Sequence, residues 1–195
     1  MIEIRSGDGL VFLDPEADEY SCCYEPERPI GAFSELVEPA RAVGLDLAHP
    51  LAEPAWIDAE QSDIPRPSFG HIVRFVYALA LSRMRFQGRS VAALANVART
   101  LGKRERPAKF TPQQISNLFR YLLALTLLRP KCLLGSFALL HFLDRYGLTA
   151  DWVFGVQLFP FRAHCWVAAD GVLLNELQHG IEDYQVIWRI EPARR

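Results

Sequence analysis

The chain has 195 residues, of which 50% are hydrophobic, 11% aromatic and 23% charged. This balance is typical of a globular protein and excludes wholesale disorder, and the length suits one domain or two small ones. The net charge of −2 is unevenly distributed, since residues 1–65 contain 15 acidic and 3 basic residues whereas residues 66–195 contain 8 and 18. We therefore expect two units, 1–65 and 66–195. The acidic unit would attract a basic peptide or dock on the basic unit. Alternatively, the two units are solvated surfaces that differ in charge and have no such partner.

No targeting or membrane-spanning segment is expected. Met1–Leu13 contains acidic residues and a Gly-Asp-Gly turn where a secretory signal needs an apolar region. The longest apolar stretch, Phe69–Phe86, is interrupted by His71, Arg74 and Arg83 and is therefore too polar for a spanning helix. We expect a cytoplasmic protein.

The four cysteines are Cys22, Cys23, Cys132 and Cys165. A reducing cytosol argues against disulfides, and no Cys-x-x-Cys or Cys/His spacing indicates a zinc site. We expect no metal and no cofactor. The remaining question is whether one cysteine is a catalytic thiol.

The first 67 residues are predicted to hold three strands, a doubtful helix and a linker. The strands are expected at Ile2–Ile4, Leu10–Leu13 and Glu19–Tyr24, with turn-forming residues between them. The apolar spacing of Phe33–Val43 predicts a helix that Pro39 kinks or breaks. Residues 46–67 are rich in Pro, Asp and Ala and are predicted to be a linker with at most a short helix.

From Ser68 the pattern becomes helical. Three helices are predicted, over Phe69–Phe86, over Ser90–Leu101 and from Thr111 to about Leu128. The last begins with a capping box, in which Thr111 is the N-cap and Gln114 the third helical residue. The basic stretch Arg99–Lys109 could contact nucleic acid, but it lacks interleaved aromatic residues, so a solvated loop is favoured.

A fourth helix is predicted to begin directly after Pro130 and to end at Gly147, which places Cys132 in its first turn. There the helix dipole and the unpaired backbone N–H groups stabilise a thiolate and lower the pKa of the thiol. Lys131 adds positive charge beside it. The alternative is a buried cysteine that acts as a small hydrophobe.

An antiparallel meander is predicted next, with strands at Asp151–Leu158, Ala163–Ala169 and Val172–Leu177. His164 begins its middle strand, so a helix that starts with cysteine would pack on a strand that starts with histidine. Papain-like and transglutaminase-like enzymes join thiol and imidazole in this arrangement. His179, in a loop, is the second candidate for the base. Alternatively, His164 is a buried core histidine without a catalytic role.

The residue that orients His164 depends on the hairpin register. If Asp170-Gly171 forms a two-residue turn, His164 faces Leu177, and Asn175 lies diagonally on the same face. A loop one residue longer, or a bulge, brings Glu176 opposite His164 instead. Either a carboxylate or an amide can hold the imidazole, so both residues remain candidates.

Three motifs together resemble the B proteins of lasso-peptide biosynthesis. The motifs are Lys-Cys-Leu-x-x-Ser-x-Ala-Leu from Lys131, Pro-Phe-x-Ala-His-x-Trp-Val from Pro160 and Asp-Gly-x-x-x-Asn from Asp170. These relatives are microcin-processing leader peptidases with a transglutaminase-like fold. The resemblance, over about residues 68–190, implies an α+β protein with a papain/transglutaminase-like core of helices and an antiparallel sheet.

The resemblance also implies roles for particular residues. Cys132 corresponds to the nucleophile and His164 to the base. Glu176 stands where the family usually has Asp as the third catalytic residue, and Asn175 remains the alternative. Gly135 and Cys165 also depart from common family residues, without touching the nucleophile or the base.

The N-terminal unit is similar to the precursor recognition element fused to some B proteins, a small winged-helix-like unit of three strands and helices. Such an element binds the leader peptide by strand addition, here beside a third strand with Tyr20, Cys22 and Tyr24. The implied function is removal of the leader peptide from a lasso-peptide precursor. The implied partners are that precursor and an ATP-dependent, asparagine-synthetase-like lasso cyclase, with no nucleic acid and no membrane span.

Two alternatives remain. The chain could be another Cys–His acyl-transfer enzyme on the same fold, such as an amidase or a transglutaminase-like protein. It could also be a non-catalytic peptide-binding chaperone of maturation.

Overall fold

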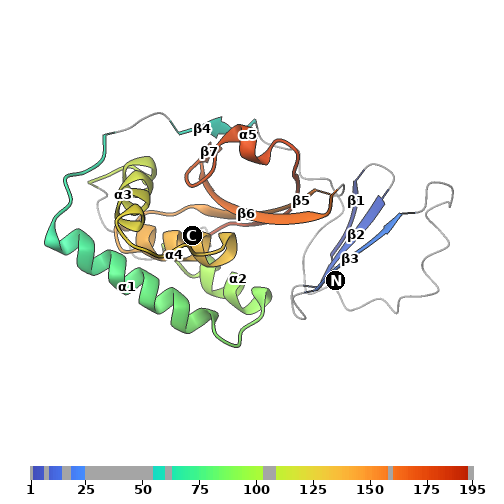
Figure 1. Cartoon of the computed structure of the whole chain (residues 1–195), viewed down its shortest axis with the longest axis horizontal. Helices are drawn as coiled ribbons and strands as arrows, with labels where there is room; N and C mark the ends of the chain where they lie inside the picture. Colours follow the sequence, from blue (N-terminus) through green and yellow to red (C-terminus); the bar gives the residue numbers. More distant parts are fainter. Residues whose placement is uncertain are drawn as a thin grey trace.

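The computed structural model describes residues 2–6, 9–14, 19–24, 55–59, 63–102, 109–157 and 160–192. Near the start, three strands form one antiparallel sheet in the order β1-β2-β3 (Figure 1). They are β1 (Ile2–Ser6), β2 (Gly9–Asp14) and β3 (Glu19–Tyr24). The three predicted strands are therefore confirmed, whereas the predicted helix at 33–43 lies outside the described residues.

The second sheet has the strand order β4-β7-β6-β5-β8 among the described residues. Its strands are β4 (Ile57–Asp58), β5 (Asp151–Gln157), β6 (Arg162–Ala169), β7 (Val172–Leu173) and β8 (Gln185–Ile190). All neighbours pair antiparallel except β4 and β7, which run parallel. The prediction that residues 46–67 are a linker with at most a short helix was wrong at β4, which pairs with β7 and extends this sheet.

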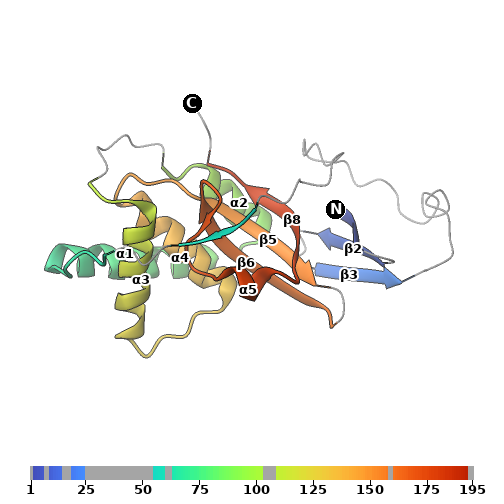
Figure 2. The same ribbon diagram turned by 90° about the horizontal axis from the view of Figure 1, so that it is seen from above.

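Five helices accompany this sheet in the described part of the chain. They are α1 (Phe69–Phe86), α2 (Val91–Arg99), α3 (Pro112–Ala124), α4 (Cys132–Asp144) and α5 (Gln178–Ile181). Figures 1 and 2 show α1, α2 and α4 on one side of the sheet and α5 on the other. The predicted α+β class is confirmed. Among the described helices none is both long and apolar enough to cross a bilayer.

The two faces of the sheet bury side chains of alternating strand positions. We call the face toward α4 the helix face and the opposite one the outer face. The helix face contributes Trp152, Phe154, Cys165, Val167 and Ala169 to the large core. The outer face contributes Val153, Trp166, Ala168 and Leu173 to a smaller cluster that Ile181 of α5 completes. By this alternation His164 belongs to the outer face, together with Trp166.

Helix α4 lies at the centre of the large core. Every residue from Ser136 to Leu143 is buried, so the helix is enclosed on all sides rather than amphipathic. It packs against β6 on one side and against α1 and α3 on the other. The N-terminus of α4, where Cys132 lies, is thereby held rigidly against the sheet.

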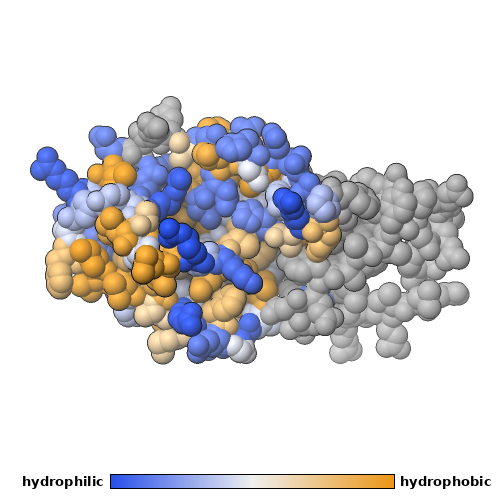
Figure 3. Space-filling view, viewed as in Figure 1, coloured by the Kyte–Doolittle hydropathy of each residue, from blue (hydrophilic) through white to orange (hydrophobic). Residues whose placement is uncertain are grey.

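Helix α1 buries only a narrow stripe, Phe75, Ala78 and Ser82. Six of its other large apolar side chains are exposed, and Figure 3 shows apolar surface gathered over this helix. They are Phe69, Ile72, Val73, Val76, Tyr77 and Met84. The prediction of Phe69–Phe86 as one amphipathic or buried helix is confirmed in extent.

The boundaries of α3 show one success and one error. The capping box forms, since Gln114 N donates to Thr111 Oγ1 at 3.2 Å and Thr111 N donates to Gln114 Oε1 at 3.0 Å. The helix ends at Ala124 rather than near Leu128. Thr126 Oγ1 donates to the Leu123 carbonyl at 2.7 Å and accepts from Leu128 N at 3.2 Å, and this local bonding replaces the next helical turn.

Candidate active site

Cys132 is the first residue of α4, as predicted. The preceding N-cap residue is Lys131, whose side chain forms no capping hydrogen bond. The backbone N–H groups of the first turn have no acceptor within the helix, so they present partial positive charge at the thiol. Cys132 is only partly buried, whereas Cys165 is buried. A thiolate at Cys132 is therefore both stabilised and accessible.

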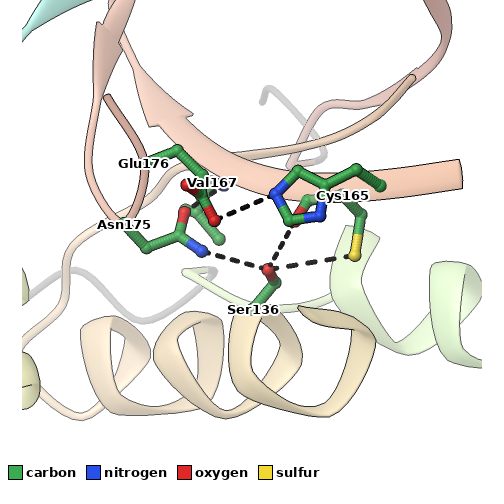
Figure 4. Close-up of polar contacts among 6 residues, drawn as sticks. Ser136, Cys165, Val167, Asn175 and Glu176 are labelled. Carbon is green, nitrogen blue, oxygen red and sulfur yellow. Dashed lines mark hydrogen bonds and ion pairs between the residues drawn. The ribbon is translucent and has the colours of Figure 1, made fainter. Parts of the chain in front are cut away.

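Ser136 fastens this end of α4 to β6. It lies one turn after Cys132, on the same face of the helix, and is fully buried. Its hydroxyl donates to the Cys165 carbonyl at 3.1 Å and accepts from Asn175 Nδ2 at 3.2 Å. Figure 4 shows Ser136 between Cys165 and Asn175. The Cys165 thiol also donates to the Ser136 hydroxyl, at 3.9 Å. The Cys132 turn is thus placed directly over the strand that carries His164.

The hairpin after β6 has the two-residue turn. Asp170 and Gly171 have φ values of 50° and 80°, and Ala168 pairs with Leu173 and Ala169 with Val172. Both positive φ angles match a type I′ turn, which an Asp-Gly sequence favours. Of the two registers that the sequence left open, the structure therefore has the one with a two-residue loop.

The pairing stops soon after the turn. Strand β7 ends at Leu173, and residues 174–176 form a bend. Leu174 N still donates to the Val167 carbonyl at 2.9 Å, but Val167 N then donates to the side-chain Oδ1 of Asn175 at 2.7 Å. Asn175 therefore closes the edge of β6 with its side chain and joins it to Ser136, and it does not hold the imidazole.

Glu176 is the residue that contacts His164. The distance between Glu176 Oε1 and His164 Nε2 is 2.9 Å, and both side chains are partly exposed. The register argument had linked a two-residue turn to Asn175 and a longer or bulged loop to Glu176. That link was wrong, because residues 174–176 form a bend and no longer follow the alternation of a strand. The bend lets Glu176 reach His164 even though the turn has two residues.

Aromatic rings on the outer face hold the imidazole in place. The His164 ring lies 6.2 Å from Trp166 and 5.6 Å from Tyr184, measured between ring centroids. Gly155 is the cross-strand partner of His164, and a Cβ there would approach Trp166 Cη2 to 2.8 Å. The absence of a side chain at Gly155 therefore lets the Trp166 ring lie across β5 beside His164.

The Cys132 thiol and the His164 imidazole act on each other, since His164 lowers the pKa of Cys132 and Cys132 raises the pKa of His164. They come from opposite sides of the sheet, so they meet at the edge of β6, where the short strand β7 has ended. Glu176 occupies Nε2 of His164, which leaves Nδ1 for the thiol. The series Glu176, His164 and Cys132 is the arrangement required to polarise a nucleophile.

The two protonation equilibria favour an ion pair. The pKa of the Cys132 thiol is lowered to about 4, first by a hydrogen bond with the Cys165 thiol and then by the one with His164, against the effect of burial. The pKa of His164 is raised to about 9, first by Cys132 and then by Glu176. Between these values thiolate and imidazolium coexist, and that is the reactive form of a cysteine nucleophile.

The pKa of Cys165 is shifted in the opposite direction to that of Cys132. Its pKa is raised well above the ordinary value, first by its contact with Cys132 and then by burial. Cys165 therefore keeps its proton, and this neutral thiol favours the thiolate form of Cys132. The sequence did not indicate this role, nor that of Ser136, although the spacing of four residues from Cys132 marks Ser136 as a neighbour on the helix.

The other residues predicted for function lie elsewhere. His179 is exposed on α5 and is not among the contacts of Cys132. Tyr20, Cys22 and Tyr24 lie on β3, and their side chains are outside what the structure describes. In the described part of the chain, no group of three or more acidic, histidine or cysteine side chains could hold a metal ion.

The fold and the site together define a mixed helix-and-sheet protein with a cysteine at a helix start and a histidine on the adjoining strand. A family model described as the transglutaminase-like superfamily matches residues 73–189, and the chain belongs to that superfamily. Its members are usually enzymes, either cysteine proteases or transglutaminases. No curated protein and no solved structure gave a significant match. The superfamily match does not distinguish the lasso-peptide B proteins from other members.

Proposed function

We propose that this chain is a cysteine peptidase that removes the leader peptide from a lasso-peptide precursor. The observation that carries the catalytic part is the hydrogen bond between Glu176 and His164, together with the mutual effect of His164 and Cys132, at the start of α4, on each other's pKa. The leader-peptide part rests on the likeness of the Cys132 and His164 motifs to lasso-peptide B proteins. The three-stranded sheet β1-β2-β3 is consistent with a fused recognition element.

Catalysis begins from the thiolate–imidazolium pair. The Cys132 sulfur attacks the carbonyl carbon at the leader–core junction and forms a tetrahedral intermediate. His164 then donates its proton to the departing amine, which leaves as the free N-terminus of the core peptide. Water, deprotonated by the now neutral His164, attacks the thioester and releases the leader as a carboxylate. Glu176 keeps the imidazole oriented and stabilises its charged form.

The start of α4 provides stabilisation for the developing oxyanion. The backbone N–H of Cys132 and its neighbours in the first turn lack intrahelical acceptors, and Lys131 adds no side-chain cap that would occupy them. Such pre-oriented donors stabilise charge that exists only in the transition state. This use of the helix terminus requires the attacked carbonyl oxygen to point toward α4.

Leader capture would occur at the N-terminal sheet. In the order β1-β2-β3 the third strand is at an edge, so its outer side can pair with an extended peptide. Tyr20, Cys22 and Tyr24 alternate along that strand and are proposed to contact leader side chains. The freed core amine would then be the substrate of an ATP-dependent lasso cyclase, the proposed partner.

The test is cleavage of a precursor peptide, followed by mass spectrometry in H₂¹⁸O with an added primary amine. We expect one cut, with ¹⁸O in the leader carboxylate. Cys132→Ala should abolish it, whereas Cys23→Ala should leave it unchanged. Cleavage that persists in Cys132→Ala contradicts the peptidase assignment. Incorporation of the amine instead of ¹⁸O identifies an acyltransferase, and tight binding without cleavage identifies a chaperone.

A further inference from the structure

A pocket of about 220 Å³ opens beside the candidate active site. Its walls come from α3, from the end of β4 and from the segment that follows the β6–β7 hairpin. The lining includes Ala59, Asn117, Arg120, Leu174, Glu176 and Leu177. Since a water molecule takes up about 30 Å³ in the liquid, this volume suits a side chain rather than a single water.

Long-range hydrogen bonds fasten two of these walls. Ser116 Oγ donates to the Leu174 carbonyl at 2.6 Å and is buried, so α3 is fixed to the bend that carries Glu176. Gln178 N donates to Asp58 Oδ1 at 2.6 Å, which fixes β4 to the start of α5. The pocket therefore has a fixed shape before any ligand enters.

Glu176 connects the pocket to the reaction. It lines the pocket and also places Oε1 2.9 Å from His164 Nε2. The pocket is thus separated from the imidazole by one side chain. Because an extended peptide advances about 3.3 Å per residue, a side chain in the pocket would belong to a residue close to the cleaved bond.

The pocket contains two charged side chains, Glu176 and Arg120, and only Glu176 has a partner among the described residues. Glu176 is paired with His164, whose pKa is raised so that it carries a positive charge at neutral pH. Arg120 is exposed, and it makes no hydrogen bond or ion pair with a described residue. A guanidinium that no described residue compensates presents a planar set of donors that fits a carboxylate. Ala59, Leu174 and Leu177 provide apolar surface for the stem of such a side chain.

We propose that this pocket is a specificity subsite that binds the carboxylate of a Glu or Asp residue of the peptide substrate, with Arg120 as its charged ligand. The proposal rests on the proposed peptidase function and adds a substrate preference to it. A Glu stem would lie on the leucines, and its carboxylate would reach Arg120 near the rim. A Lys or Arg residue at the same substrate position would be repelled.

Peptide cleavage tests the preference. A set of fluorogenic decapeptides based on the precursor cleavage site places Glu or Gln at each position on either side of the cut. We expect kcat/KM to be at least tenfold higher for Glu at one position. Arg120→Gln should reduce that ratio to about one, and Arg120→Glu should make Lys the preferred residue there. Arg129→Gln is the matched control, because Arg129 is exposed and, among the described residues, bonds only backbone carbonyls.

A second measurement does not depend on cleavage. Titration of the Cys132→Ala protein with glutarate, followed by ¹H–¹⁵N NMR, should shift the amides of Leu174 and Leu177 saturably. Glutaramide and the additional change Arg120→Gln should each abolish these shifts. Equal shifts with both compounds, or no shifts with glutarate, overturn the subsite proposal. If glutarate binds through Arg120 but no peptide is cleaved, the subsite stands and the peptidase function fails.

Discussion

The two faces of β6 use different means to position one pair of reactive groups. On the helix face, Cys165 and Ser136 lie in a large apolar core and act on Cys132 through α4. On the outer face, His164 lies beside a smaller cluster and is held by two aromatic rings and a carboxylate. The thiol is thus placed by rigid packing and the imidazole by contacts with individual side chains. Changes on the two faces should therefore have separable effects.

Among changes to the residues that position the reactive pair, the largest effect on activity is expected from Glu176→Gln, on the outer face. It removes the anion that orients His164 and favours its charged form, so kcat/KM should fall by roughly 100-fold, within the range of general acid–base contributions. Because a nearby carboxylate raises the pKa of an imidazole, its loss should also move the alkaline limb of the pH–rate profile below about 9. Glu182→Gln, an exposed change in the same segment, is the control. An unchanged alkaline limb would exclude Glu176 as the orienting residue.

Gly155→Ala should disturb the same face by steric means. The added Cβ would lie 2.8 Å from the ring of Trp166 and 3.1 Å from the Cβ of Tyr184, the two residues whose rings flank His164. Overpacking of this kind costs about 1–3 kcal/mol of unfolding free energy, measurable by urea denaturation, and activity should fall with it. Gly70→Ala, with no atom nearer than 3.8 Å, should be tolerated. Equal stability of both variants would contradict the close packing at Gly155.

Ser136→Ala tests the helix face. It leaves Asn175 Nδ2 and the Cys165 carbonyl without their hydroxyl partner, which should cost about 1–3 kcal/mol of unfolding free energy. Activity should decrease because α4 is no longer fastened to β6 at the Cys132 turn. Ser82 is equally buried, but its hydroxyl has no partner among the described residues. Ser82→Ala should therefore be nearly neutral in thermal unfolding, and a similar loss in both variants would argue against the fastening role.

The smallest effect is expected from Cys165→Ala. The hydrogen bond with Cys165 is the largest influence that lowers the pKa of Cys132, so its removal should raise that pKa above about 4. The acid limb of the pH–rate profile should then move to higher pH, with little change near neutral pH. Cys165→Ser, which keeps a donor, should restore much of the original limb. An acid limb that is the same in all three proteins would show that Cys165 does not act on the thiolate.

Several local features could be predicted because short sequence signals determine them. The Thr111–Gln114 capping box and the Asp170-Gly171 turn depend on neighbouring residues alone, and both are present. The position of Cys132 at a helix start followed from Pro130 and was also correct. Each of these features needs no knowledge of distant contacts.

Other features depend on tertiary contacts and were missed. The two-residue strand β4 shows no periodicity and exists through its pairing with β7. Strand β8 was not anticipated either, although it pairs with β5 on the far side of the sheet. The end of β7 at Leu173, which decides that Glu176 rather than Asn175 meets His164, results from the Asn175 side chain replacing the next backbone bond to Val167. A register argument alone could not show where the pairing stops.

The central claim is that Cys132 and His164 form a thiolate–imidazolium pair. The direct measurement is the rate of iodoacetamide alkylation at each cysteine as a function of pH, quantified by peptide mass spectrometry. The structure predicts that Cys132 reacts at a nearly constant rate from about pH 5 to pH 8 and much faster than Cys22 or Cys23, because its pKa is lowered to about 4. A Cys132 rate that instead rises through the ordinary thiol range near pH 8.5, no faster than at Cys22 and Cys23, would contradict the account.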